Sequence, residues 1–427
     1  MPADGLDLAP FRGVRYAPDR VGGLAAVTSP PYDVVVRPEG LRALETADPH
    51  NIVRLILPQA SAPGEAHRRA AATLRAWRAE GVLVRDPEPA FYVYEQRHGS
   101  TVTQRGIIGA LRLTPPERGI VLPHEDTVPE VVAERASLLR ATAANLEPLL
   151  LTYRGGGPAA GTAAVIARAA ARPPLLAATA PDGTGHRLWA VTAPADQETV
   201  RRGLATRRAM IADGHHRWAT YLRLHQEHGG APPWDRGLVL LVDADRYPLR
   251  VRPIHRVFPG LPPAEALARA AAGFRVRPLG SGLEDALAAL AAVPPSDGNA
   301  MVVAGGGGFH LLDRPDPALL ARTVPAGRPE AWRRLDTAVL RATLLGTLWR
   351  GTAAGAVRYV HDAGAAVAAA ARSGGSAVLL RPVAEETVRG LAERGVTLPE
   401  KATSFGPKPA TGLVLRLLDE GGTPDCG

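Results

Sequence analysis

The segment 209–217, which reads AMIADGHHR, is the part of the sequence that indicates the fold most clearly. Its apolar first half leads into Asp213-Gly214, a dipeptide typical of a tight turn, and the following residues 218–224 have helical apolar spacing. This order predicts a strand, a turn and the start of a helix. The first turn of a helix offers free backbone N–H groups at the positive end of the helix dipole, and residues 215–217 add further donors. The segment therefore predicts a phosphate-binding site.

The role of Asp213 stays open at this point. Its carboxylate could cap the helix, or it could serve as a base or a metal ligand. The alternative for the whole Gly-His-His-Arg pattern is a capped helix start with exposed histidines.

Length and composition favour a folded protein of two domains. The chain has 427 residues, of which 46% are hydrophobic and 22% charged, values that argue against disorder. A Pro-rich stretch at 259–263 suggests domains at 1–260 and 261–427. No apolar run approaches the length of a membrane span, and residues 1–5 lack signal-peptide features, so we expect a cytoplasmic protein. The single cysteine, Cys426, excludes an intramolecular disulfide and a cysteine zinc cage.

Helical and strand patterns alternate and predict a mixed α/β fold. We expect helices near 71–79, 131–144, 264–272, 283–292 and 384–394. Strands are expected near 90–94, 149–153, 247–251, 377–380 and 412–417.

The net charge of +8 is spread along the chain without a basic run of five residues, which argues against nucleic-acid binding. Among the 50 basic residues only Lys401 and Lys408 are lysine, and both lie in the segment KATSFGPK. An ammonium retained where arginine is otherwise used suggests a point-charge contact that a planar guanidinium cannot make. We therefore expect the two ammonium groups to contact bound phosphate in a cleft between the two domains, with Lys401 or Lys408 converging on residues 214–217.

Several motifs together resemble the bacterial and archaeal family named domain of unknown function 1015. They are SPPYD at 29–33, NIVRLILP at 51–58, HEDT at 124–127, ATAAN at 141–145, DGHHR at 213–217, PIHRV at 253–257, KATSFGPK at 401–408 and TGL at 411–413. Family members often have a hydroxyl residue and a tyrosine where this chain has Ala402 and Ser404. The family name implies no function.

A more distant resemblance does imply one. Residues 214–217 are similar to the signature of the superfamily that contains ParB-type CTPases, sulfiredoxin and archaeal free-serine kinases. The resemblance implies a ParB/sulfiredoxin-like N-terminal part, in which this motif holds nucleotide phosphates. The serine kinases also carry an aspartate before the glycine, as Asp213 does here, and use a separate glutamate as base. Glu125 is our candidate for that base, because His124-Glu125 precedes an expected helix start. Sulfiredoxin chemistry is excluded, since Cys426 lies beside the C-terminus.

The resemblance makes a small-metabolite phosphotransferase the leading function, most specifically a free-serine kinase or the related phosphoserine chemistry. The alternative is a ParB-like nucleotide-binding regulatory module without metabolite turnover. We expect ATP, ADP or pyrophosphate as the phosphorylated ligand, leave Mg²⁺ open, and find no direct metal motif. The catalytic candidates are Asp213, Glu125 and His216, and the phosphate-binding candidates are Gly214, His215, His216, Arg217, Lys401 and Lys408. The substrate-pocket candidates are Tyr32, Asp33, His124, Arg135, His255 and Arg256.

Overall fold

The computed structural model describes residues 5–35, 38–156, 161–280, 282–351 and 357–418. Cys426, to which the sequence assigns no disulfide, lies outside these residues. The chain forms two compact units. Unit 1 comprises Met1–Pro123, Thr127–Leu249 and Pro407–Gly427, and unit 2 comprises His124–Asp126 and Arg250–Gly406.

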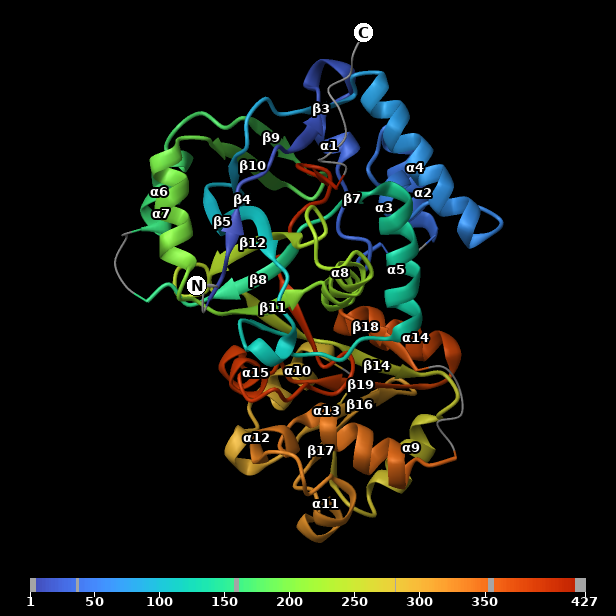
Figure 1. The fold of residues 1–427 in the computed structure, drawn as a ribbon. Coiled ribbons are helices and arrows are strands. Elements are labelled where there is room, and N and C mark those ends of the chain that lie inside the picture. Colours follow the sequence, from blue (N-terminus) through green and yellow to red (C-terminus); the bar gives the residue numbers. More distant parts are fainter. Residues whose placement is uncertain (1–4, 36–37, 157–160, 281, 352–356, 419–427) are drawn as a thin grey trace. The chain divides into compact units, whose positions relative to one another are not determined.

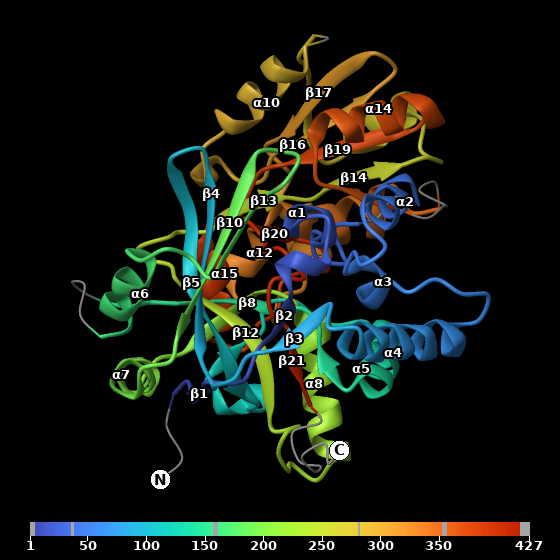
Figure 2. The ribbon, with the colours of Figure 1, turned by 90° about the horizontal axis from the view of Figure 1, so that it is seen from above.

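Unit 1 is built on a mixed sheet whose strands lie side by side in both ribbon views (Figure 1, Figure 2). The strand order is β6 (Val121–Leu122), β11 (Ala209–Asp213), β8 (Leu149–Tyr153), β12 (Arg236–Asp243), β5 (Thr101–Arg112), β4 (Phe91–His98), β10 (Thr184–Val191) and β9 (Leu176–Thr179). Strand β1 (Leu8–Ala9) also pairs with β5. The pairs β6–β11 and β8–β12 are parallel, and the other neighbours are antiparallel.

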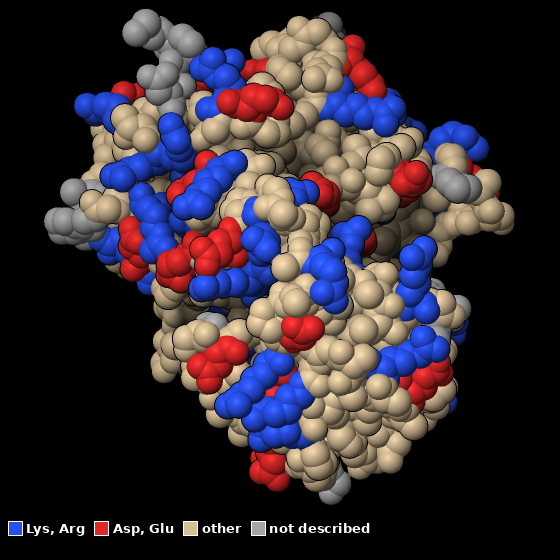
Figure 3. Space-filling model, turned by 90° about the horizontal axis from the view of Figure 1, so that it is seen from below, with Lys and Arg blue, Asp and Glu red and all other residues tan. Residues whose placement is uncertain are grey.

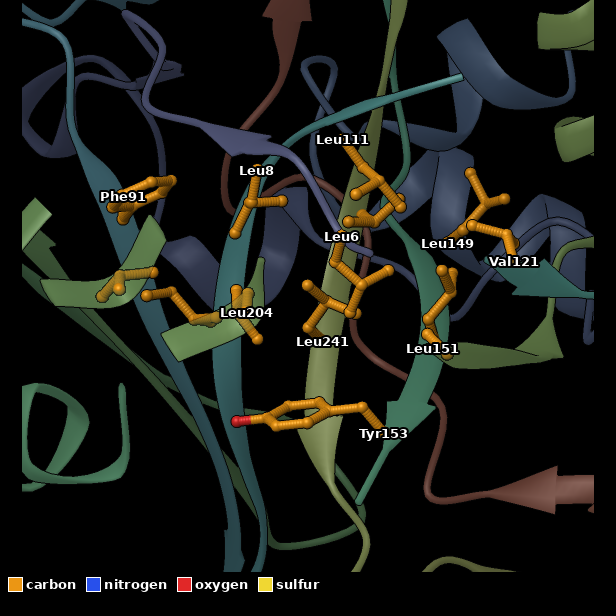
Figure 4. Packing of buried hydrophobic residues seen from close by; sticks show 14 of the residues in the cluster. Leu6, Leu8, Phe91, Leu111, Val121, Leu149, Leu151, Tyr153, Leu204 and Leu241 are labelled. Carbon is orange, nitrogen blue, oxygen red and sulfur yellow. The ribbon is translucent and has the colours of Figure 1, made fainter. Parts of the chain in front are cut away.

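One face of this sheet carries the main apolar core of unit 1. The helices that contribute to it are α5 (Pro129–Thr142), α6 (Thr162–Ala170), α7 (Pro194–Leu204) and α8 (His215–Glu227). Alternate residues of β8, such as Leu149 and Leu151, point into the core beside Leu241 of β12 (Figure 4). Burying each such leucine stabilises the fold by about 1.5–3 kcal/mol.

A second apolar cluster in unit 1 joins the beginning and the end of the chain. It contains residues from β2 (Val14–Tyr16), β3 (Leu83–Arg85), β7 (Ala144–Asn145), β21 (Arg416–Leu417), α1 (Leu24–Val27), α3 (Val53–Ile56) and α4 (Pro63–Ala79). Helix α2 (Pro38–Ala47) packs beside α1 and α3. Because β21 pairs with β7, the segment that begins at Pro407 is fixed to unit 1.

Unit 2 contains an antiparallel sheet covered by helices. Its strand order is β15 (Arg275–Pro278), β17 (Gly308–Asp313), β16 (Met301–Gly305), β19 (Ser376–Leu380), β14 (His255–Phe258) and β18 (Arg358–Val360), while β13 (Arg250–Pro253) pairs separately with β20 (Thr403–Gly406). The α-helices are α9 (Pro263–Ala270), α10 (Leu283–Ala291), α11 (Pro317–Thr323), α12 (Glu330–Arg333), α13 (Asp336–Val339), α14 (Ala363–Ser373) and α15 (Glu385–Ala392), and a π-helix spans Leu340–Leu348.

The mixed α/β class predicted from the sequence is confirmed. The expected helices and strands are present with shifted ends, except that the strand expected at 412–417 is reduced to β21, since Gly412 has a φ of 98° and bends the chain. The division into domains also differs from 1–260 and 261–427. The boundary between the two units lies at Leu249–Arg250, because β13 and β14 pair with strands of unit 2. The last segment, which begins at Pro407, belongs to unit 1 again.

Charges on the face shown in Figure 3 are interspersed, with Lys and Arg beside Asp and Glu. Among the described residues, no helix combines the length and the apolar character that crossing a membrane requires.

Candidate functional site

The junction between β11 and α8 has the predicted strand, turn and helix order. Gly214 is the N-cap residue and has a φ of 102°, in the left-handed region that favours glycine. A Cβ atom at this position would lie 2.9 Å from Leu149 Cγ and 3.2 Å from Arg217 Nε. The N-cap residue has no side chain that could cap the helix, and Asp213 Oδ2 accepts a hydrogen bond from Arg217 Nη2.

An irregularity in β11 sets the direction of Asp213. Ile211 lies opposite Leu151, but the register then shifts and Asp213 lies opposite Leu150. Residues opposite each other in a sheet point to the same face. Ile211 and Leu151 belong to the main apolar core, so the shift turns the Asp213 carboxylate to the other face of the sheet.

Lys408 meets Asp213 on that face. The Lys408 ammonium lies 2.5 Å from Asp213 Oδ1 and also donates to Asp33 Oδ2. Burial alone would lower the pKa of Lys408, but Asp213 and Asp33 outweigh that effect and hold it above its usual value. Lys408 is therefore a permanent cation between two carboxylates. Its partner Asp213 is the residue before the segment 214–217, while convergence on that segment and a role in phosphate binding stay predictions.

Backbone contacts within unit 1 fix the Lys408 loop. Gln104 Nε2 donates to Pro407 O at 2.8 Å, and Ala410 N donates to the Tyr94 hydroxyl at 3.2 Å. Ser29 and Thr411 exchange two backbone hydrogen bonds of 3.1 and 2.8 Å. The last pair ties this loop to the SPPYD turn that carries Asp33.

Arg217 turns inward, and phosphate binding by this residue stays a prediction. Its side chain is 7% exposed, donates from Nη2 to Asp213 Oδ2 at 2.7 Å, and donates from Nη1 to Pro148 O at 3.1 Å. Both Nη groups are thus used by the protein itself. Arg217 thus holds the Asp213 carboxylate in place.

Glu147 is a site residue that the sequence analysis missed. Its Oε1 accepts hydrogen bonds from Tyr32 N at 3.1 Å and from Thr411 Oγ1 at 3.2 Å, and its Oε2 lies 3.9 Å from Arg217 Nη1. Burial raises its pKa, and burial also raises that of Asp213. The only sequence signal was an acidic residue inside the apolar run ANLEPLLL at 144–151.

These side chains form a row of alternating charge, which we call the charged chain. Its members, in order, are Asp33, Lys408, Asp213, Arg217 and Glu147. With every member ionised, three carboxylates face two cations. The raised carboxyl pKa values mean that the charged chain retains a proton to a higher pH than exposed carboxylates would.

Other predicted residues of unit 1 surround the charged chain. The Arg135 guanidinium lies 4.3 Å from the centre of the Tyr32 ring and donates to Ile56 O at 2.8 Å. His216 Nε2 accepts from Val128 N at 3.1 Å, a contact that fixes the start of α5. His215 is buried in the first turn of α8. The structure thus places Tyr32, Arg135, His215 and His216 in the same unit as Asp213.

The predicted residues of unit 2 hold the other part of the lysine segment. Glu125 Oε1 accepts from Lys401 N at 3.2 Å, and His124 Nε2 lies 3.2 Å from Thr403 Oγ1. Lys401 has a φ of 54°, an uncommon value for a residue with a side chain. Phosphate binding by Lys401 and a catalytic role for Glu125 stay predictions.

His255 and Arg256 are integrated into the packing of unit 2. His255 Nδ1 accepts from Leu380 N at 3.2 Å, and burial lowers the pKa of His255 to about 4, so its ring is neutral. Arg256 donates to the Lys401 carbonyl oxygen at 2.8 Å. Both contacts fit a structural role, and substrate binding by either residue stays a prediction.

Comparison with known families gives a match over residues 8–338 to the model described as "Protein of unknown function (DUF1015)". The chain belongs to this family. The matched range in this DUF1015 protein includes every member of the charged chain except Lys408. A search of curated proteins finds no significant match.

Solved structures give weak similarities to this DUF1015 protein. A mutant free serine kinase in complex with AMP has 17% sequence identity and a TM-score of 0.35, covering 67% of this chain and 84% of that chain. SbnI with a C-terminal truncation from Staphylococcus aureus has 13% identity and a TM-score of 0.37, covering 74% of this chain and 90% of that chain. A conserved hypothetical protein from Pyrococcus furiosus has 18% identity and a TM-score of 0.33, covering 67% of this chain and 87% of that chain.

Proposed function

We propose that this protein is a phosphotransferase acting on a small metabolite, with an amino-acid hydroxyl such as that of free serine as the acceptor. The observation that carries the proposal is the Lys408 ammonium on Asp213 Oδ1, at the residue before the N-cap of α8. A fixed cation beside a helix N-terminus supports binding of a phosphorylated ligand. The similarity of residues 214–217 to a phosphate-holding signature points the same way.

In this proposal the first turn of α8 and Lys408 bind the phosphates of ATP, ADP or pyrophosphate. Phosphoryl transfer depends mainly on positioning and on electrostatic stabilisation of the transferred group. The first turn of α8 contains no acidic residue that would repel phosphate. His215 and His216 lie in this turn, and in the proposal they contact the ligand.

The transfer step with ATP balances as follows. The acceptor hydroxyl oxygen forms a bond to the γ-phosphorus, the bond from that phosphorus to the β,γ-bridging oxygen breaks, and ADP leaves. The hydroxyl proton passes to a carboxylate. Asp213 is our candidate, because burial raises its pKa and makes it a stronger base than an exposed aspartate. Glu125 is the second candidate base.

Arg217 acts in this proposal by holding Asp213 Oδ2, which leaves Oδ1 facing Lys408. Asp33 and Asp213 do not offer Mg²⁺ a pair of available carboxylates, because the Lys408 ammonium contacts both of them. We therefore expect Mg²⁺, where it takes part, to be held largely by the ligand phosphates.

The proposal is tested by calorimetric titration of ATP, ADP, pyrophosphate and phosphoserine into the full-length protein. We expect at least one of them to bind, and Lys408→Gln to weaken that binding about tenfold or more, since a charge-assisted hydrogen bond contributes about 1.5–3 kcal/mol. Arg68→Gln, at an exposed position of α4, is the matched control for lost charge. Equal affinity of Lys408→Gln and the parent protein would contradict the phosphate site.

The regulatory-module alternative gives a different outcome. A module of that kind binds nucleotide and changes its assembly, yet forms no phosphorylated amino acid with any nucleotide or Mg²⁺ condition. That pattern would replace the phosphotransferase proposal.

A further inference from the structure

A groove of about 630 Å³ lies in unit 1, and no member of the charged chain is among its lining residues. Three parts of unit 1 line it: β1 with the end of β5, the 3-10 helix η2 (Pro116–Arg118) with the residues beside it, and the C-terminal half of α7. Leu6, Leu8 and Leu111 anchor its floor in the main apolar core (Figure 4). One water needs roughly 10–15 Å³, so the groove has room for roughly 40–60 waters, the size class of a small-molecule ligand.

Four of the lining residues are arginines with exposed side chains. They are Arg112 at the end of β5, Arg118 at the end of η2, and Arg201 and Arg202 in the last turn of α7. The helix dipole favours cations at the end of α7, which accounts for the last two. It does not account for Arg112 and Arg118, which belong to a strand and to a single turn of 3-10 helix. The groove therefore gathers cations from three separate elements.

Two carboxylates, Asp7 and Glu198, also line the groove, so four arginines against two acids leave a net charge of +2. Asp7 accepts hydrogen bonds from Arg112 Nε at 2.7 Å and from Arg236 Nη2 at 3.0 Å. Burial would raise the pKa of Asp7, but Arg236 and Arg112 outweigh that effect and lower it. Asp7 is therefore ionised, and two cations already neutralise it.

The other three arginines are held only loosely by the protein itself. Glu198 lies 3.3 Å from Arg202 Nε and 3.6 Å from Arg201 Nη1, and the side chains of these two arginines are 72% and 57% exposed. Exposed ion pairs of this kind are weak and exchange readily with a stronger anion. Within the described ranges of the chain, Arg118 has no ion pair. These three guanidinium groups are thus available to a ligand.

We propose that this groove binds a small molecule with at least two phosphate groups, which contacts Arg118 together with Arg201 and Arg202. Guanidinium groups donate paired hydrogen bonds that match the oxygens of a phosphate. A single phosphate would fill only a small part of 630 Å³, so several linked phosphates are needed to contact arginines from different elements at once. This second anion site goes beyond the proposed function, which uses the phosphate site at the start of α8.

Calorimetric titration of tripolyphosphate into the full-length protein tests the groove by the number of sites. The parent should bind tripolyphosphate at two sites, the groove and the site at the start of α8. Arg118→Gln/Arg202→Gln should weaken the groove site at least tenfold and keep the other, whereas Lys408→Gln should do the reverse. Arg68→Gln/Arg75→Gln removes the same charge from exposed positions of α4 and should keep both sites.

Competition experiments in Lys408→Gln identify the kind of anion. Orthophosphate should compete for the groove at least tenfold more weakly than tripolyphosphate, because one phosphate cannot contact arginines from different elements. Citrate and a single-stranded oligodeoxynucleotide should also compete at least tenfold more weakly. Equal competition by orthophosphate or citrate would overturn the polyphosphate assignment, and equal competition by the oligonucleotide would make the groove a nucleic-acid site instead.

The same titrations distinguish failure of the groove from failure of the proposed function. Tripolyphosphate binding that Lys408→Gln weakens but Arg118→Gln/Arg202→Gln leaves unchanged would overturn the groove and leave the proposed function standing. The opposite pattern would support the groove and contradict the phosphate site at α8. No binding by the parent would overturn both. Since both arginines are exposed, the double variant should keep the melting temperature of the parent, and Arg118→Gln alone should already weaken the groove site at least threefold.

Discussion

Lys408 Nζ lies 2.5 Å from Asp213 Oδ1, while Arg217 Nη2 holds the other oxygen of the same carboxylate at 2.7 Å. The two cations come from segments far apart in the sequence and share one buried aspartate. Because the ammonium also contacts Asp33, a single lysine links the SPPYD turn to the end of β11. The arrangement of the site therefore depends on Lys408.

Two substitutions of Lys408 should distinguish its contribution to stability from its contribution to phosphate binding. Lys408→Met leaves two carboxylates without their shared cation, and removing one partner of a buried ion pair costs about 3–5 kcal/mol. Lys408→Arg keeps the charge and should cost less stability, yet it should lose at least tenfold in phosphate affinity, because a planar fork does not replace a compact ammonium. Urea unfolding measures the first effect and calorimetry the second. Parent-like phosphate binding by Lys408→Arg would show that any cation serves here.

Arg217 should behave as a positioning residue. Arg217→Ala leaves Asp213 without its Oδ2 partner and should lower the free energy of unfolding by about 3–5 kcal/mol. Arg217→Lys retains the charge but cannot reach both Asp213 and Pro148 O, so we expect an intermediate loss of stability and a lower kcat with little change in KM for nucleotide. A parent-like kcat for Arg217→Lys would contradict a positioning role for Arg217.

Gly214→Ala tests the turn before α8. The substitution combines a φ of 102° with a Cβ only 2.9 Å from Leu149 Cγ. Gly81→Ala is the matched control, because Gly81 also has a positive φ of 72° but nothing within 4 Å of a Cβ. Strain from φ alone costs on the order of 1–3 kcal/mol, and Gly214→Ala should cost more than Gly81→Ala in thermal or urea unfolding. Equal losses would mean that the close approach to Leu149 does not matter.

Because the pKa of Glu147 is raised, we expect the free energy of unfolding to depend on pH. Burial raises its folded-state pKa above the ordinary value of 4.5, so between these two values the folded state binds more protons than the unfolded state. The free energy of unfolding should then fall as pH rises through that window, by up to about 1.4 kcal/mol per pH unit. Glu147→Gln cannot titrate and should gain stability relative to the parent as the pH rises above 4.5.

Urea unfolding at several pH values checks this difference, with Glu88→Gln as the control at an exposed carboxylate. If the free energies of unfolding of Glu147→Gln and the parent change with pH in parallel, the carboxyl group of Glu147 does not have a raised pKa.

The sequence predicted the strand, turn and helix over 209–224 because apolar spacing and the Asp-Gly dipeptide act locally. It also singled out Lys408, through the scarcity of lysine rather than through any spacing. It did not reveal the ion pair between Arg217 and Asp213, because a sequence does not show that the register of β11 shifts and turns Asp213 away from the apolar core. An arginine one helical turn after Asp213 then has a buried partner within reach.

Glu147 could not be found from local pattern. Its partners Tyr32 and Thr411 lie in segments that meet only when the chain end returns to unit 1 and Thr411 pairs with Ser29. The same return explains why a domain boundary read from Pro-rich composition failed to include residues 407–418 in unit 1. Such long-range pairing is set by the packing of β21 on β7, which neither residue composition nor periodicity encodes.

The most direct test of the phosphotransferase proposal is phosphorus NMR of the protein with ATP, Mg²⁺ and L-serine, alongside Lys408→Arg and Asp213→Asn. We expect a phosphoserine resonance and stoichiometric ADP with the parent protein. We also expect a rate at least tenfold lower for Lys408→Arg, and a rate lower by about 10²–10⁴ for Asp213→Asn. ATP that binds but yields no phosphorylated amino acid, or an Asp213→Asn variant as fast as the parent, would contradict it.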